Sequence, residues 1–310
     1  MAPKPFSIGS TELPLSRLDR HRMHFAGSYQ GPKGMRSRAW RRDAVHLAYT
    51  QAGNLGMTRY HGGFRLVRKS FEESTYLVDV CWTNEGQLLI GARQSEMLIW
   101  NFASTQLLSR RHLSGYINDI DCRGDGIVLA GTRDGQMIVV NVETDEKPRY
   151  IRHNKQEAAL SSVAWSPNGT LAATASHDAT AIVWDPLTSK KRQKLHHEGI
   201  VSDLAWAPSS HFLATASADY TVAVWQIGVE NPVRKLPHDG EVLKVAWSPK
   251  GGHLLTVAQG PNSRYASLWS LSNPSNEPVV TQDIPEGSSD MAWHPGGEFV
   301  VLGDERWTFR

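Results

Sequence analysis

Thirteen histidines are the first residues in this 310-residue chain whose type could support chemistry, because imidazole is a common metal ligand. Their spacing argues against a metal centre. His112, His197 and His238 lie far apart, and the sequence contains no Cys/His or His-x-x-x-His cluster with zinc-ligand spacing. We therefore expect no bound metal.

Catalytic motifs give a similar result. The chain has no G-x-S-x-G elbow, and Gly31-Pro32-Lys33-Gly34 lacks the spacing of a phosphate-binding loop. Asp43, Glu72 and Glu73 show no pairing that suggests general acid–base catalysis. We expect a protein that is not an enzyme and that uses no cofactor or small-molecule substrate.

The composition is that of a soluble globular protein, with 40% hydrophobic and 21% charged residues. No apolar run reaches the roughly 18 residues of a membrane-spanning helix, and the N-terminus lacks a hydrophobic signal core. Cys81 and Cys122, the two cysteines, fall inside predicted strands. We interpret them as buried free thiols of a reducing compartment.

Charge is concentrated at the N-terminus. Residues 1–43 carry a net charge of +6 and the remainder −4. The arginines of this basic arm are Arg17, Arg20, Arg22, Arg36, Arg38, Arg41 and Arg42. Such an arm suits an anionic partner, either RNA or an acidic protein surface, although a solvated tail has the same composition. A second basic run, Lys190–Lys194, could steer an acidic partner or act in nuclear targeting.

Five tryptophans recur at a nearly fixed interval. The steps Trp165–Trp206 and Trp206–Trp247 are 41 residues each, Trp247–Trp293 is 46, and Trp82–Trp165 is 83, close to two steps. A period of roughly 40–45 residues is typical of propeller blades, each of which buries its apolar faces against its neighbours. The spacing therefore predicts an all-β repeat architecture.

Each repeat has the pattern of a strand meander. In residues 158–185, small residues alternate with larger apolar ones up to Trp165, and a Pro-Asn-Gly turn then leads to two further strands ending at Trp184. Residues 199–226 repeat this pattern up to Trp225. Turn signals about every 8–12 residues indicate antiparallel strands.

These runs resemble WD-repeat blades. The clearest are VAWSPNGTLAATASHDATAIVWD and LAWAPSSHFLATASADYTVAVW. Weaker copies occur at Ala44–Val67, Thr75–Phe102, Gly115–Val142, Gly240–Gly260 and Ser288–Glu305. In the weakest copy Tyr49 occupies the position of the first Trp. The resemblance covers residues 44–310 and implies a seven-bladed WD-repeat β-propeller.

The last repeat ends soon after its third strand, at Arg310. WD-repeat rings usually complete the final blade with a strand from the N-terminus, which protects an open sheet edge. Residues 35–41 alternate in character and are the predicted closing strand. We therefore expect a basic, partly ordered extension at 1–34 and a propeller at 35–310.

The resemblance also implies a polar network in each complete blade, formed by a His, a Ser or Thr, a turn Asp and a Trp. One blade supplies the full set: His197, Thr215 or Ser217, Asp219 and Trp225. The preceding blade has Asp178 and Trp184, but Gln156 stands at the His position; the following one has His238 without the Asp. Because such a network adds rigidity only when every member is satisfied, we expect residues 158–250 to be the most rigid.

Loops remain as the candidate site. The turns between second and third strands, and the connections between blades, share one face of a propeller. The candidate partner-binding residues on it are Arg133, His177, Tyr220, Tyr76 and Tyr116. Exposed aromatic and Arg side chains on loops are frequent anchors of protein interfaces. We expect this face to bind protein subunits.

Two short segments are similar to the WD-repeat subunit of the THO complex, a nuclear assembly that links transcription to mRNA export. They are Val45–Tyr49, and Met291–Pro295 with the following Phe299–Asp304. The resemblance implies a scaffold subunit in the nucleus, with the cytoplasm as the alternative. Two other functions remain open: a substrate adaptor of a ubiquitin ligase, and a ribonucleoprotein component that binds RNA through its basic arm.

Overall fold

The computed structural model describes residues 23–28, 35–41, 43–51, 54–60, 64–66, 71, 76–83, 87–154, 157–285, 290–302 and 305–309. For residues 23–28, 35–38, 51, 64–66 and 305–309 it describes the backbone only.

The described residues form seven four-stranded antiparallel sheets. The first three consist of β2 (Met35–Trp40), β3 (His46–Gln51), β4 (Asn54–Tyr60) and β5 (Phe64–Leu66); β6 (Asp79–Thr83), β7 (Leu88–Arg93), β8 (Glu96–Asn101) and β9 (Leu107–His112); and β10 (Ile117–Cys122), β11 (Ile127–Thr132), β12 (Gln136–Asn141) and β13 (Arg149–Arg152).

The next three consist of β14 (Leu160–Trp165), β15 (Ala172–Ser176), β16 (Thr180–Asp185) and β17 (Lys190–His196); β18 (Val201–Trp206), β19 (Phe212–Ser217), β20 (Thr221–Gln226) and β21 (Arg234–Pro237); and β22 (Glu241–Trp247), β23 (His253–Gln259), β24 (Arg264–Ser270) and β25 (Val280–Ile284). The last sheet has the order β1 (Met23–Ser28), β28 (Glu305–Phe309), β27 (Phe299–Leu302) and β26 (Met291–Trp293).

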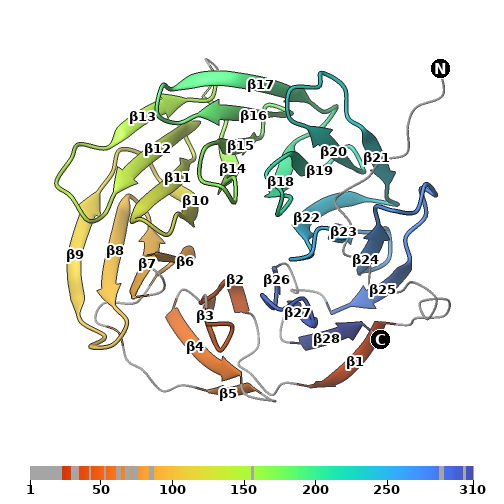
Figure 1. Ribbon diagram of the computed structural model, residues 1–310, viewed down its shortest axis with the longest axis horizontal. Coiled ribbons are helices and arrows are strands. Elements are labelled where there is room, and N and C mark those ends of the chain that lie inside the picture. The colour runs from red at the N-terminus through yellow and green to blue at the C-terminus, as the bar shows by residue number, and fades with distance from the viewer. Residues whose placement is uncertain are drawn as a thin grey trace.

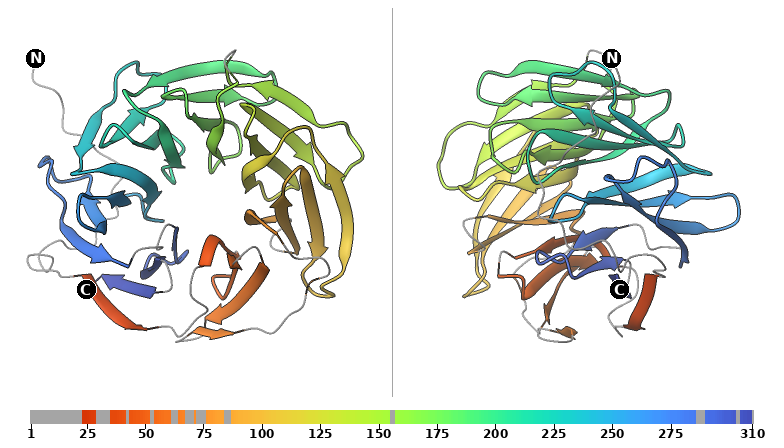
Figure 2. Two further views of the ribbon diagram at one scale, coloured as in Figure 1. Left: turned by 180° about the vertical axis from the view of Figure 1, so that it is seen from behind. Right: turned by 45° about the vertical axis from the view of Figure 1, so that its right-hand side comes forward.

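The sheets stand side by side around a central axis, as Figure 1 shows, and the views from behind and from one side show the same ring (Figure 2). The first strand of each repeat lies nearest the axis and the fourth lies at the rim. The expected all-β propeller is confirmed.

The core lies between neighbouring sheets. One apolar cluster joins Ala214 and Val224 of one sheet to Val245 and Leu254 of the next, with Trp247 packed among them. Because each sheet is covered on both faces, its middle strands are buried continuously instead of alternately; all five residues of β15 are buried. This packing makes each blade depend on its neighbours.

The last sheet is closed from the N-terminus, but the predicted closing segment was wrong. Strand β1 pairs with β28, for example Met23 with Phe309, and thereby forms the rim strand of the last sheet. Residues 35–40 instead form β2, the innermost strand of the first sheet. The propeller therefore begins at residue 23 among the described residues, so the proposed boundary at residue 35 is too late.

This arrangement also corrects the repeat alignment of the first blade. Trp40, at the end of β2, occupies the place that Trp165 has at the end of β14, and the step from Trp40 to Trp82 is 42 residues. Tyr49 lies in the second strand, where its ring packs against the backbone of Gly56. The interpretation of Tyr49 as the first-strand residue was wrong because it missed this 42-residue step.

The two cysteines form a disulfide bond between β6 and β10, so the expectation of free thiols was wrong. Their separation of 41 residues is one repeat step. Equivalent positions in consecutive first strands lie beside each other in this ring, which brings the two Cα atoms to 5.7 Å.

Candidate functional site

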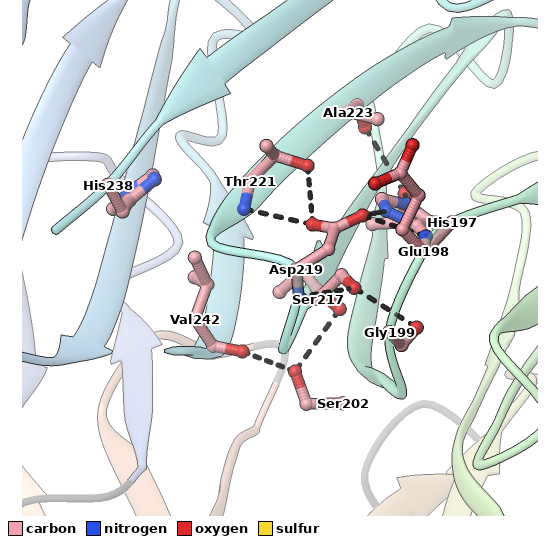
Figure 3. A network of polar contacts seen from close by, with 12 residues as sticks. His197, Glu198, Gly199, Ser202, Ser217, Asp219, Thr221, Ala223, His238 and Val242 are labelled. Carbon is pink, nitrogen blue, oxygen red and sulfur yellow. Dashed lines mark hydrogen bonds and ion pairs between the residues drawn. The ribbon is translucent and has the colours of Figure 1, made fainter. Parts of the chain in front are cut away.

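The predicted polar network forms in the sheet β18–β21. Nδ1 of His197 hydrogen-bonds with the Asp219 carboxylate at 2.7 Å, and Nε2 hydrogen-bonds with the Thr215 hydroxyl at 2.7 Å. Nε1 of Trp225 donates to the same hydroxyl at 2.8 Å. Figure 3 shows His197 and Thr221 directed toward the two oxygens of Asp219. Thr215 is therefore the hydroxyl member of this network.

Ser217, the other candidate, has a different function. Its hydroxyl donates to the carbonyl of Gly199 at 3.2 Å and accepts from the backbone N–H of Asp219 at 3.1 Å (Figure 3). It thereby fixes the turn that carries Asp219 to the start of the first strand. Ser217 positions the network without belonging to the His–Thr–Trp series.

The neighbouring sheet β14–β17 has a complete network, contrary to expectation. The buried His153 supplies the imidazole: Nδ1 hydrogen-bonds with Thr174 at 2.7 Å, and Nε2 lies 3.5 Å from the Asp178 carboxylate. Nε1 of Trp184 donates to Thr174 at 2.9 Å. The His position was wrongly assigned to Gln156, because the loop before β14 is three residues longer than in the next repeat.

In the sheet β22–β25 the network lacks its carboxylate, as the sequence indicated. Nε2 of His238 hydrogen-bonds with Thr256 at 2.9 Å, and Nε1 of Trp269 donates to Thr256 at 3.1 Å. Nδ1 of His238 donates to the carbonyl of Leu236 at 3.0 Å instead of bonding an Asp. The network is thus complete in the two sheets β14–β17 and β18–β21, and it lacks its carboxylate in the adjacent sheet β22–β25.

Burial controls the charge state of these groups. It lowers the pKa of His153 and of His238 to about 4, so both imidazoles are neutral at pH 7. Burial alone would raise the pKa of Asp219, but hydrogen bonds from His197 and Thr221 bring it below its usual range. Asp178 has a lowered pKa in the same way, through Thr180 and Asn154. His153 and His238 therefore act as neutral hydrogen-bonding groups that stabilise the fold.

The five candidate partner-binding residues lie at one end of the sheets. We call this surface, formed by Tyr76, Tyr116, Arg133, His177 and Tyr220, the loop face. The N–H of Arg133 donates to the carbonyl of Tyr116, and that of His177 donates to Ala159, so second-strand ends adjoin first-strand starts. Tyr76, Tyr116 and Tyr220 are 78%, 54% and 52% exposed. The structure brings Arg133 and Tyr116 together, with the guanidinium 5.7 Å from the ring centroid.

Two of these tyrosines have a positive backbone φ angle. Tyr220 has φ 68° and Tyr76 has φ 61°, in the left-handed region that disfavours most side chains. Tyr220 occupies the turn position taken by Gly135 (φ 77°) and Ala179 (φ 64°) in the two preceding repeats. An exposed aromatic ring therefore stands where glycine would fit with less strain.

A cavity of about 730 Å³ lies where the first strands meet, and the sequence reasoning did not anticipate it. Its polar lining includes Asp79, Asp119, Asp121, Lys244 and Asp290. Burial raises the pKa of Asp121 to about 6, whereas Asp203 beside Lys244 raises the pKa of that lysine.

Carboxylates of the first strands accept hydrogen bonds from backbone N–H groups of the next sheet. The pairs are Asp79 with Ile120, Asp119 with Val163, Asp121 with Trp165 and Asp203 with Val245, at 2.7–3.0 Å. Each pair spans 41–44 residues, about one repeat step. An Asp recurring shortly before the first-strand Trp is the signal that could have revealed this function. These carboxylates join neighbouring blades at the axis.

The described part of the basic arm belongs to the first sheet. Arg17, Arg20, Arg22 and Arg42 lie outside the described residues, and Arg36 and Arg38 belong to the innermost strand of the first sheet. Arg41 forms an ion pair with Asp43 at 2.6 Å and lies over the ring of Phe102. Arg41 therefore links the first sheet to Phe102 of the second, and the expectation that residues 35–41 close the last sheet was wrong.

The described part of the chain holds neither a cluster of metal ligands nor a membrane-spanning helix. No group of three or more His, Cys, Asp or Glu side chains there is arranged to hold a metal ion. In the same residues, no helix has the length and apolar character needed to cross a membrane.

Comparison with known proteins agrees with this geometry. The family model for the WD domain, G-beta repeat, matches residues 147–185 and 189–226, so the chain contains WD40 repeats within a β-propeller. Each matched repeat begins with the rim strand of one sheet and continues through three strands of the next, which interlocks neighbouring blades. No curated protein matches the chain.

Among solved structures, a chain from a crystal structure of the mitotic checkpoint complex is similar with a TM-score of 0.79 and 18% sequence identity. The match covers 100% of this chain and 97% of that chain. At this identity the similarity establishes the fold alone.

Proposed function

We propose that the protein is a non-catalytic scaffold that holds other protein subunits through its loop face. The observation that carries the proposal is the set of three exposed tyrosines on loops anchored in a rigid ring. Tyrosine is enriched at interface hot spots because it offers a large contact area with few rotatable bonds. Tyr116 and Arg133 already contact each other, which limits the entropy lost when a partner covers them.

The WD40 repeats and the similar chain in the checkpoint complex support this coarse assignment. That chain is part of a multiprotein assembly, and its fold is the one described here. A propeller provides a broad, preformed surface, so binding requires little ordering of the ring itself.

We propose the THO complex as the specific assembly and the nucleus as its location. The support is the sequence of the first and last blades. Val45–Tyr49 overlaps β3 of the first sheet, and Met291–Pro295 contains β26 of the last sheet. Both segments therefore lie at the junction between the first and last sheets, where the ring closes. In this junction the ring of His294 contacts Trp40 and stacks on Phe299.

The test is affinity purification of the full-length tagged protein from nuclear extract at 300 mM salt, followed by quantitative mass spectrometry and reconstitution with purified subunits. The proposal predicts stoichiometric recovery of THO subunits and a complex that re-forms from purified components. Recovery of a cullin–adaptor pair would instead contradict the THO assignment and support the ubiquitin-ligase alternative.

A further inference from the structure

The rim of the ring carries a strong and one-sided charge. The four consecutive rim strands β9, β13, β17 and β21 contain ten Lys or Arg residues and no Asp or Glu. Figure 1 shows these strands following one another along one arc of the ring. The next rim strand, β25, has Asp283 and no Lys or Arg. We call the Lys and Arg residues of the four strands the basic rim.

Ion pairs neutralise only part of this charge. Arg111 pairs with Asp145, Arg152 with Glu157 and Arg192 with Asp185. Three others, Arg149, Lys191 and Arg234, donate to backbone carbonyls, which orients the side chains but leaves their charge uncompensated.

The excess is greatest on β17. Lys190 and Lys194 are exposed there, and no carboxylate of the described residues lies within ion-pair distance of either ammonium. Lys235 on β21 is also exposed, and no carboxylate of the described residues lies within ion-pair distance of its ammonium. Exposed acidic residues occur in the loops between these strands: Glu143 and Glu146 lie in the loop before β13, and Glu230 lies in the loop before β21. The cations without a carboxylate partner are therefore concentrated on β17 and β21.

We propose that the basic rim binds a nucleic-acid strand through its phosphates. A folded acidic protein needs a contact surface with an apolar centre, and lysine is depleted from such centres. The rim strands offer few exposed apolar side chains, chiefly Leu108 and Tyr150, and the cavity of the ring lies at its axis instead. Cations spread along an arc with little apolar surface match a long phosphate backbone better.

This interaction does not depend on base sequence, and its affinity depends on the salt concentration. Phosphate contacts by Lys and Arg release counterions, so affinity falls steeply with ionic strength. Non-specific binding of this kind has a dissociation constant of roughly 1–100 μM at physiological salt. The ring of Tyr150, 42% exposed between Arg149 and Arg152, offers one surface on which an unpaired base can stack.

Fluorescence anisotropy with the full-length protein tests the proposal. The probes are a 20-nucleotide oligouridine, an RNA duplex of that length and a 20-residue polyglutamate, each titrated at several salt concentrations. The test variant combines Lys190→Gln, Lys194→Gln and Lys235→Gln. The control combines Arg59→Gln and Lys250→Gln, exposed residues outside both the rim strands and the loop face, and it is compared with the Lys190→Gln, Lys194→Gln double variant, which removes the same charge.

The rim variant is expected to bind oligouridine at least about tenfold more weakly at 50 mM salt, with a logarithmic salt slope shallower by roughly 2. The control variant should lose much less. If the single strand binds more tightly than the duplex, the rim prefers single-stranded nucleic acid. If the two bind equally, the rim recognises the phosphates alone. Equal losses in the control and the double variant, or polyglutamate binding as tightly as RNA, would overturn the proposal.

Discussion

Tyr220 combines an exposed aromatic ring with a backbone conformation that glycine adopts more readily. Tyr220→Gly relieves strain but frees the unfolded chain, two effects of about 1 kcal/mol with opposite sign. We expect the free energy of unfolding to change by less than about 1 kcal/mol, while partner binding weakens by more than about 1 kcal/mol. Ala179→Gly, which has the same conformation without the ring, should leave binding unchanged. Denaturant titration and calorimetry distinguish the two effects.

The two complete networks predict similar costs for losing their carboxylates. Asp219→Ala and Asp178→Ala each leave a buried or half-buried partner unsatisfied, which costs about 1–3 kcal/mol. With Gln156 at the His position, the network of Asp178 would be incomplete and its loss would cost less; His153 completes this network. Urea denaturation of both variants is the check, and a loss at Asp219 alone would mean that the contacts of Asp178 contribute no stability.

The buried histidines predict loss of stability in acid. Their pKa is lowered in the folded state, so the unfolded chain binds protons more tightly as pH falls from about 6.5 to 4. Each should cost about 2 kcal/mol between pH 7.5 and 5. Asp121, with its pKa raised to about 6, acts in the opposite sense over pH 4–6. His238→Gln should therefore lose about 2 kcal/mol less than the native chain; an unchanged pH profile would contradict this assignment.

At the scale of the elements, β1 closes the ring. Deleting residues 1–22 leaves β1 in place, whereas deleting residues 1–30 exposes the edge of β28. We expect the melting temperature of the longer deletion to fall by several degrees and that of the shorter one to stay near the native value. Equal melting temperatures would show that β1 does not close the last sheet.

The sequence predicted which residues form strands more reliably than it predicted which strands pair with each other. The Trp period predicted the meanders of β14–β16 and β18–β20, because period-two burial and turn residues are local properties. Which N-terminal segment pairs with β28 depends on a contact between residues nearly 290 positions apart, such as Met23 with Phe309, and no local pattern specifies it. The three-residue insertion before β14 hid His153 for a related reason: the alignment assumed a constant spacing.

At the scale of the whole molecule, the loop face was predictable from the sequence, but the hydrogen bonds that join neighbouring blades were not. Tyr116, Arg133 and Tyr220 could be placed on loops from turn chemistry. The carboxylates that join neighbouring blades, such as Asp79 with Ile120, became recognisable only once consecutive first strands were seen side by side. These bonds hold the blades at fixed positions, so tyrosines from different blades can form one surface.

The most direct test of the scaffold function is the affinity of the purified partner complex for a variant with Tyr76→Ser, Tyr116→Ser and Tyr220→Ser. These side chains are exposed, so the fold should keep its stability within about 1 kcal/mol. The matched control is Leu108→Ser with Leu187→Ser, which removes exposed apolar side chains outside the loop face. Isothermal titration calorimetry should show at least a hundredfold loss of affinity for the tyrosine variant and none for the control. Native affinity in the tyrosine variant would contradict the assignment of the loop face as the partner-binding surface.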